Sequence, residues 1–232
     1  MRRIADIAYI PHSSAAFFAE GRRSLSCGND SGERMRQLSF KQYRAMDLAL
    51  FALIGAASQA LITVAATRWY AEQLYVVSPV AAVTAIVMMR WGGFAALHAA
   101  LGGAALSFFS GGSCKHFLIY ALGNLLSLAA LPVLNRRGKE TVRASVGQTL
   151  LFGAAVQELM LLGRMLMALV TGYGWQESLG FLTTDELSVV FTLVIVWIAR
   201  RVDGLMEDQR HYLRRIQNEM QTEAQTKGGE QL

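Results

Sequence analysis

The residues of this sequence most able to do chemistry are two opposite charges inside one apolar stretch. In AAVQELMLLGRMLMALV, residues 154–170, the charged residues are Glu158 and Arg164, and the remaining polar one is Gln157. An ionisable side chain in the middle of a membrane costs at least about 2.5–3.5 kcal/mol and is usually functional or paired. In a helix, Arg164 shares a stripe with Gln157, whereas Glu158 points about 120° away from Arg164. Each charge therefore needs a partner outside this helix.

Two interpretations of these charges follow. In the structural interpretation, polar side chains of other helices satisfy both Glu158 and Arg164. The candidate partners are Gln59, His98, Lys115 and Asn124. In the functional interpretation, Arg164 and Glu158 point into a cavity that opens at the outer face and contact a polar or anionic substrate. Asn124 is a further candidate for substrate binding, although such a residue more often forms an interhelical hydrogen bond.

Further candidates flank the apolar runs. Lys115 and His116 stand at the start of such a run, where the free backbone N–H groups of a helix favour an anion. The preceding glycines, Gly111 and Gly112, allow a loop to approach a ligand closely, and flexible linkage is the alternative. The aromatic candidates for substrate binding, which can equally be anchors at the membrane interface, are Trp69, Tyr173 and Trp175.

No catalytic or metal-binding constellation is visible in the sequence. Ser110 and His116 are close, but no nucleophile-elbow motif accompanies them. The two cysteines, Cys27 and Cys114, have neither CxxC nor metal-ligand spacing. No GxxxxGK[ST] loop is present, so we expect any ATP to be hydrolysed by partner subunits. We therefore predict a protein that is not an enzyme and that holds neither a cofactor nor a metal.

The elements that position these residues follow from the composition. Hydrophobic residues make up 53% of the 232, and only 17% are charged, against about 25% in a typical soluble domain. Residues 46–134 include only five charged ones. Such apolar stretches with charges at their ends indicate an integral membrane protein. The net charge of +5 does not indicate a nucleic-acid partner, because the basic residues lie beside the apolar runs, where they orient the chain.

We predict six transmembrane helices within residues 45–200, and hence an all-α fold. A helix that crosses a membrane needs about 20 largely apolar residues. The second and sixth predicted spans fall short of this length. Pro79 lies near the start of the second, and Thr184 or Asp185 is the expected N-cap of the sixth. The predicted spans are Met46–Thr67, Leu74–Met89, Trp91–Phe109, Phe117–Leu134, Ser145–Val170 and Leu187–Ala199.

Lysine and arginine residues in the short flanks predict the orientation, because cytoplasmic loops are enriched in them. Basic residues cluster before the first span, in NRRGKETVR between the fourth and fifth spans, and after the sixth span. The opposite side holds only Arg68 and Lys115. We therefore expect both termini in the cytoplasm and the protein in the plasma membrane.

The two ends of the chain differ from the membrane domain. Residues 1–44 are polar and rich in Ser, Gly and Arg, which predicts a disordered extension, or one that is absent if translation starts at Met35. Residues 201–232 are expected to form a cytoplasmic amphipathic helix and tail. This helix would lie on the inner membrane surface, pack on a partner or continue the sixth span. Its apolar stripe consists of Val202, Met206, Gln209, Leu213, Ile216 and Met220.

Small residues recur every four positions in the first predicted span. Ala52, Ala56 and Ala60 form this row, and Gly55 lies beside it. Such a row makes a shallow stripe on which another helix can pack closely. The helix that packs there belongs either to the same chain or to a separate membrane subunit.

Taken together, these patterns resemble the substrate-binding S components of energy-coupling factor (ECF) vitamin transporters. The resemblance covers residues 46–201. It is carried by ALFALIGAASQA in the first span, by PVAAVTAIVMMRWGGFAALHAALGGAALSF and by FLIYALGNLL in the fourth span. The basic RRGKE loop and GRMLMALVTG in the fifth span add to it. The match is one of overall pattern, and the long C-terminal tail departs from it.

The resemblance implies a six-helix membrane protein that binds a vitamin or similar micronutrient near the outer face of the lipid bilayer. Such S components work with a shared transmembrane coupling (T) subunit and two cytosolic ATPase subunits. The family's small-residue row docks the T subunit, which would here be Ala52, Ala56 and Ala60. The family shares little sequence at its ligand positions, so the resemblance assigns no pocket residue to this chain.

Two other functions compete with this interpretation. One is an intramembrane enzyme such as a rhomboid-like protease, against which the lack of a convincing Ser/His pair counts. The other is a membrane scaffold of the cell envelope that works through its tail. Ligand dependence separates the three, because a binder should gain thermal stability with its vitamin.

Overall fold

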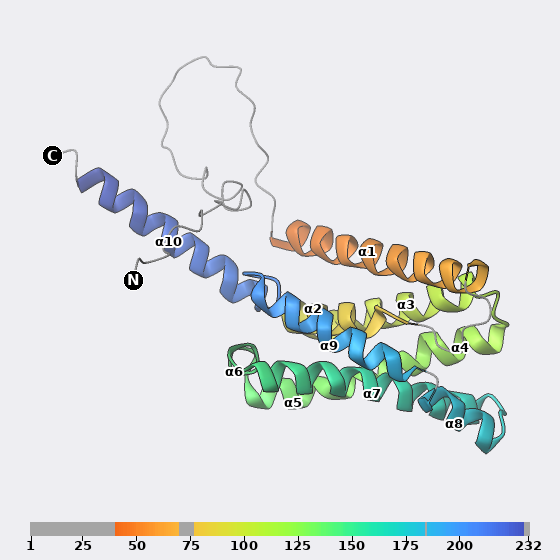
Figure 1. The fold of residues 1–232 in the computed structure, drawn as a ribbon. Coiled ribbons are helices and arrows are strands. Elements are labelled where there is room, and N and C mark those ends of the chain that lie inside the picture. Colours follow the sequence, from red (N-terminus) through yellow and green to blue (C-terminus); the bar gives the residue numbers. More distant parts are fainter. Residues whose placement is uncertain (1–39, 70–76, 184, 230–232) are drawn as a thin grey trace, which may run out of the picture. The chain divides into compact units, whose positions relative to one another are not determined.

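A computed structural model describes residues 40–69, 77–183 and 185–229 of the chain. Within these ranges the regular structure is entirely helical, which confirms the all-α part of the predicted fold. The elements, in chain order, are α1 (Phe40–Arg68), α2 (Val80–Trp91), η1 (Gly92–Phe94), α3 (Ala95–Phe109), α4 (Cys114–Gly123), η2 (Asn124–Ala129), α5 (Ala130–Arg137), α6 (Lys139–Ala144), α7 (Val146–Val170), α8 (Trp175–Thr183), α9 (Glu186–Arg201) and α10 (Gln209–Gly229), where η marks a 3₁₀ helix (Figure 1).

Five helical stretches in the described part of the chain are long and apolar enough to cross a membrane. They are Phe40–Arg68, Val80–Phe109, Cys114–Arg137, Val146–Val170 and Trp175–Arg201. The lipid bilayer requires such stretches because a helix satisfies all of its backbone polar groups internally. The length and composition of these helices therefore indicate a membrane-embedded protein.

The second of these stretches folds back on itself. The turn is at Gly92, whose φ of 62° lies in the left-handed region that favours glycine. A Cβ atom on Gly102 would lie 2.6 Å from the side chain of Val80, so the start of α2 faces the second half of α3. The arms are 12 and 15 residues long, each shorter than a full span. A count of six membrane crossings stays a prediction.

The second predicted span begins later than expected. Its helix starts at Val80, after three described residues, 77–79, that are not helical. Pro79 is its N-cap, as the position of a proline near a helix start predicts. The rest of the expected start, residues 74–76, lies outside the described residues. The reason for the shift is that Ser78 forms its hydrogen bonds with side chains of other helices, and its N–H is therefore not part of a helical turn.

The segments that carry the predicted basic loops come together at one end of the bundle, which we call the basic end: residues 90–94, 136–145 and 200–208. Arg90 forms an ion pair with Asp47 at 2.7 Å and donates to the carbonyl of Gly204 at 2.5 Å. Arg143 binds Glu207 at 2.8 Å. We call the other end, with residues 110–116, 172–183 and 185, the distal end. That the basic end faces the cytoplasm stays a prediction.

Helix α7 is the centre of the packing. It packs against α2, α4, η2, α8 and α9. The apolar core around it is almost fully buried and includes Met88, Met89, Val156, Met160 and Val196. Because α7 contacts so many elements, the direction of each of its faces is set, and with it the direction of the polar side chains it carries.

The tail helix begins later than the expected boundary at residue 201. Helix α9 ends at Arg201, a turn with Gly204 at φ 70° follows, and α10 begins at Gln209. Met206, expected on the stripe of the tail helix, is instead buried in the apolar core. The tail helix is therefore not a continuation of α9. At the other end, residues 40–44 belong to α1, and the extension expected over residues 1–39 lies outside the described residues.

Candidate functional site

The site is built around a close crossing of α4 and α7. A Cβ atom on Gly163 would lie 2.0 Å from the carbonyl oxygen of Gly123. A Cβ atom on Gly123 would lie 2.8 Å from the backbone of Arg164. Only glycine permits this approach, because real Cβ atoms do not come that close to a backbone. The crossing brings Arg164 beside Asn124, the first residue of η2.

Arg164 is buried, with 1% of its surface exposed, and has partners on two other segments. Its Nε donates to Oδ1 of Asn124 at 2.7 Å, and its Nη1 donates to the carboxylate of Asp185. The guanidinium also lies over the ring of Tyr120, 4.8 Å from the centroid. We call these four residues the arginine centre. The prediction that Arg164 finds its partners outside its own helix is confirmed, and Asn124 is one of the partners expected from the sequence.

Asn124 is fixed by both of its amide atoms. Its Oδ1 accepts from Arg164, and its Nδ2 donates to the carbonyl of Ala99 at 3.0 Å. It is completely buried. This hydrogen-bonding joins α3, η2 and α7 and matches the interhelical role that was the alternative to substrate binding. Gln157, which shares the stripe of Arg164, is also buried and accepts from Thr192 of α9.

A cavity of about 140 Å³ adjoins the arginine centre. It is lined by segments of α1, α3 and α4, by the residues before α2 and by the residue before α9. These lining residues are Thr63, Ala66, Thr67, Ser78, Leu106, Ser110, Tyr120 and Asp185. Thr67 and Ser110 are exposed, so the cavity reaches the surface at the distal end. At about 30 Å³ per water molecule, its volume corresponds to roughly five waters or one small organic molecule.

Arg164 itself does not line this cavity. It is connected to the cavity by Asp185, which lines the wall and accepts a hydrogen bond from Arg164. Tyr120 covers the guanidinium with its ring and lines the cavity as well. Its hydroxyl makes no hydrogen bond with any of the described residues. The wall therefore offers hydroxyl groups and one carboxylate, and a ligand there would meet the arginine only through them.

A buried polar network holds the α1 side of the wall. Gln59 is fully buried and donates through Nε2 to Oγ1 of Thr63 at 2.9 Å. Ser78 donates through Oγ to Oε1 of Gln59 at 2.8 Å, and its backbone N–H donates to Oγ of Ser188 at 2.9 Å. Buried polar groups of this kind are costly unless they are paired. The network therefore fixes α1, the residues before α2, and α9 around the cavity.

A row of rings leads from the arginine centre to the start of α4. The ring of Tyr120 lies 5.8 Å from that of Phe181, which lies 6.3 Å from that of Tyr173. Tyr173 in turn lies 6.1 Å from His116, with its hydroxyl 3.4 Å from Nε2 of the imidazole. Two predicted site residues, Tyr173 and His116, are thus brought together outside the cavity. The N–H of His116 is also capped by Ser113, which partly satisfies the helix start that was expected to hold an anion.

The structure does not bring the remaining predicted residues into the site. Glu158, at the middle of α7, is exposed on the same outward face as Leu162. The expectation that Glu158 faces the interior is therefore wrong, because the faces of α7 that pack are those of Gln157 and Arg164. Lys115 and the two tryptophans, Trp69 and Trp175, are exposed at the distal end. Exposed indole rings there agree with the alternative role as interface anchors.

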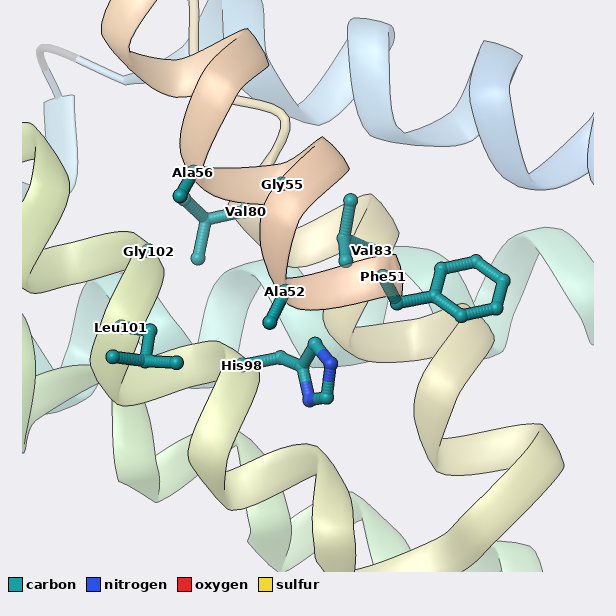
Figure 2. Close-up of a pocket in the computed structure, with 9 residues that line it drawn as sticks. All are labelled: Phe51, Ala52, Gly55, Ala56, Val80, Val83, His98, Leu101 and Gly102. Atoms are coloured by element: carbon teal, nitrogen blue, oxygen red, sulfur yellow. The ribbon is translucent and has the colours of Figure 1, made fainter. Parts of the chain in front are cut away.

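The row of small residues in α1 faces the rest of the chain. Ala52 and Ala56 line a pocket of only about 10 Å³, together with His98 and Gly102 of α3 and Val80 of α2 (Figure 2). Ala60 is half-buried. The imidazole of His98 donates through Nε2 to the carbonyl of Leu48 at 2.9 Å, which ties α1 to α3. The row thus packs α1 onto the α2–α3 hairpin, and docking of a separate subunit by it stays a prediction.

Replacing Ala56 with Leu is expected to destabilise the isolated protein by about 1–3 kcal/mol, because the pocket has no space for the added carbons. The measurement is the thermal unfolding midpoint in detergent. Ala57→Leu is the matched control, since Ala57 lies about 100° round α1 from Ala56, is exposed and should tolerate the change. An unchanged midpoint for Ala56→Leu would contradict the packing role and leave docking of a partner as the function of the row.

Sequence reasoning missed Asp185 and Tyr120 as members of the site. Asp185 was expected only as the N-cap of the last span; it occupies that position, but its carboxylate makes no cap hydrogen bond and binds Arg164 instead. A search for an acidic partner of the one arginine inside an apolar run would have included Asp185. For Tyr120 no signal in the sequence distinguishes it from other aromatic residues of apolar runs.

The described residues include no group of three or more His, Cys, Asp or Glu side chains placed to hold a metal ion. Comparisons with protein-family models, with curated proteins and with solved structures found no match to this chain. The features that bear on its function are therefore the membrane-embedded helical fold and the geometry of the arginine centre and its cavity.

Proposed function

We propose that this protein is the membrane-embedded substrate-binding subunit of an ATP-driven importer for a small polar micronutrient. The observation that carries the proposal is the cavity itself. It adjoins a buried arginine whose charge is paired with Asp185, it is lined by hydroxyl groups and a carboxylate, and it reaches the surface at the distal end. Polar groups that converge on a small cavity within apolar helices are typical of a ligand site.

The lining favours one class of ligand. Asp185 and the hydroxyls of Thr63, Ser78 and Tyr120 present acceptors and rotatable donors to the cavity. The positive charge of Arg164 is already neutralised by Asp185, so the wall has little net charge. A neutral molecule that donates hydrogen bonds, or one with a single cationic group, therefore suits it better than the anion that the sequence suggests. Leu106 and Ala66 supply the apolar part of the contact.

Import requires partners that the chain itself does not supply. Its sequence contains no ATP-binding loop, so hydrolysis would fall to two cytosolic ATPase subunits through a transmembrane coupling subunit, as the resemblance to S components implies. In this proposal the distal end faces the outside, the basic end faces the cytoplasm, and both termini are cytoplasmic. The positive-inside distribution of Lys and Arg supports this orientation.

The first experiment identifies the ligand. The protein is purified in detergent, and the small molecules that it retains are released and identified by mass spectrometry. Addition of the identified molecule at about 100 times its Kd should stabilise the protein by about 2.7 kcal/mol. A preparation that retains no small molecule, and that no candidate vitamin stabilises, would refute the binding role.

Tyr120→Phe is expected to weaken ligand binding about tenfold, because it removes a cavity hydroxyl that has no partner among the described residues while it keeps the ring over Arg164. A tenfold loss corresponds to about 1.4 kcal/mol, within the range for one hydrogen bond to a ligand. Isothermal titration of the purified variant measures it. Tyr173→Phe is the matched control, since Tyr173 does not line the cavity. An equal loss of affinity in both variants would indicate that the ligand does not bind in the cavity and contacts the row of rings instead.

A further inference from the structure

A second hollow, which shares no lining residue with the cavity at the arginine centre, lies on the surface between α5 and α7. These helices lie side by side and are joined through α6 (Figure 1). The hollow has a volume of about 360 Å³, and nearly all of its lining is apolar. Val133 of α5 and Leu151 of α7 line it and are more than half exposed, so it is open along its side. We call it the α5–α7 groove.

The length of the groove matches one leaflet of a bilayer. Its lining on α7 extends from Gln148 to Leu159. At 1.5 Å per residue this is about 16 Å, roughly half of the 30 Å hydrocarbon thickness. An open apolar groove of that length, parallel to a membrane-spanning helix, fits one extended acyl chain. It offers no hydrogen-bonding edge to a polar solute along most of its length.

The polar residues that line the groove lie only where the groove approaches the basic end of the bundle. Arg137, the last residue of α5, lines the groove, is exposed, and forms no ion pair or hydrogen bond with any residue that the structure describes. Two nearby basic residues are already paired: Lys139 binds Asp208 at 2.7 Å, and Arg143 binds Glu207, whereas Arg136 does not line the groove. Arg137 is thus a cation at the mouth of an apolar groove that is available for an anion.

A second observation points to a ligand at the same place. Oε1 of Gln148 is buried and has no hydrogen-bond partner among the described residues, although Gln148 also lines the groove. A buried amide oxygen without a partner is unfavourable, because it has lost water and gained no donor. A hydroxyl-bearing headgroup at the mouth would satisfy it. The groove therefore presents a cation and an unsatisfied amide beside a channel for a hydrocarbon chain.

We propose that the α5–α7 groove binds one anionic phospholipid, with an acyl chain along the groove and the headgroup phosphate at Arg137. Basic pockets between transmembrane helices are suited to anionic headgroups, and phosphate accepts two parallel hydrogen bonds from a guanidinium. Phosphatidylglycerol fits best, because its glycerol hydroxyls can donate to Gln148. This proposal does not depend on the import function, since the groove and the cavity share no lining residue.

The test is native mass spectrometry of the purified full-length protein exchanged into mixed micelles of phosphatidylglycerol and phosphatidylcholine in equal amounts. One phosphatidylglycerol molecule should be retained at least tenfold in preference to phosphatidylcholine. Arg137→Gln should abolish this preference. Arg136→Gln is the matched control, because it removes the same charge from the adjacent residue, which does not line the groove and should keep the preference.

Two further arms distinguish the occupant. Ala155→Phe should fill the groove and reduce retention of phosphatidylglycerol at least tenfold without changing any charge, whereas Ala154→Phe, outside the lining, should not. Inorganic phosphate at millimolar concentration should not displace the lipid. Equal retention of both lipids by the unmodified protein, displacement by phosphate alone, or full retention by Ala155→Phe would overturn the proposal. Arg137 is exposed, so loss of folding does not explain an effect of its replacement; unchanged thermal midpoints check this.

Discussion

Arg164→Met is expected to destabilise the protein by about 3–5 kcal/mol. The substitution keeps an unbranched side chain, although a shorter one, but leaves the carboxylate of Asp185 without its cation and Oδ1 of Asn124 without its donor. Removing one partner of a buried ion pair has this cost because the other charge remains desolvated. For a membrane-embedded unit of this size, the corresponding fall in the thermal midpoint is roughly 6–20 °C.

The measurement is thermal unfolding of the purified protein in detergent, followed by circular dichroism. Arg136→Met is the control, since Arg136 is exposed and has no ion pair within the described ranges. The double variant Arg164→Met with Asp185→Asn should recover part of the loss, because it removes the orphaned charge. If Arg164→Met unfolds at the same temperature as the unmodified protein, the ion pair does not hold the bundle together. The structural role of the arginine would then be wrong.

Gly163→Ala is expected to prevent stable assembly of the helix bundle, although it adds a single methyl group. The new Cβ atom would lie 2.0 Å from the carbonyl oxygen of Gly123 and 2.8 Å from the Cβ of Leu126. The first contact is with backbone, so no rotamer change relieves it, and α4 and α7 must separate. Overpacking in a core costs about 1–3 kcal/mol where side chains can move, and we expect more than that here.

Gly147→Ala provides the control for this prediction. Gly147 lies in the first turn of the same helix, and a Cβ atom there would meet nothing within 4 Å. Alanine has the higher helix propensity, so this variant should be unchanged or slightly more stable. Yield of folded protein after extraction and the thermal midpoint measure both variants. A Gly163→Ala protein as stable as Gly147→Ala would show that the close crossing of α4 and α7 does not exist as described.

Several features of the fold could be predicted because they depend on composition along a single segment. Apolar length identifies the helical stretches that can enter a membrane, and residues 114–137 and 146–170 lie close to their predicted bounds. The seven-residue spacing of Gln157 and Arg164 places both on one buried stripe, as the helical repeat requires. The basic loops lie at one end of the bundle, since their positions follow from the alternation of the helices.

Other features depend on contacts between distant segments. The pairing of Arg164 with Asn124, 40 residues away, exists because Gly123 and Gly163 allow α4 and α7 to touch. Neither glycine is distinguishable in the sequence from other glycines of apolar runs. The start of α2 at Val80 and the burial of Met206 likewise follow from side chains of other elements.

Glu158 and Arg164 illustrate the division between the two sources of information. The sequence by itself determined that the chain is helical and membrane-embedded, that these charges lie inside an apolar helix, and that they point in different directions around it. Only the tertiary structure decided which charge is buried with partners and which is exposed. The physical reason is that lipid is as apolar as a protein core. The lipid-facing side of a membrane helix is therefore not marked by polar residues, and the sequence does not show which side of the helix packs against the rest of the protein.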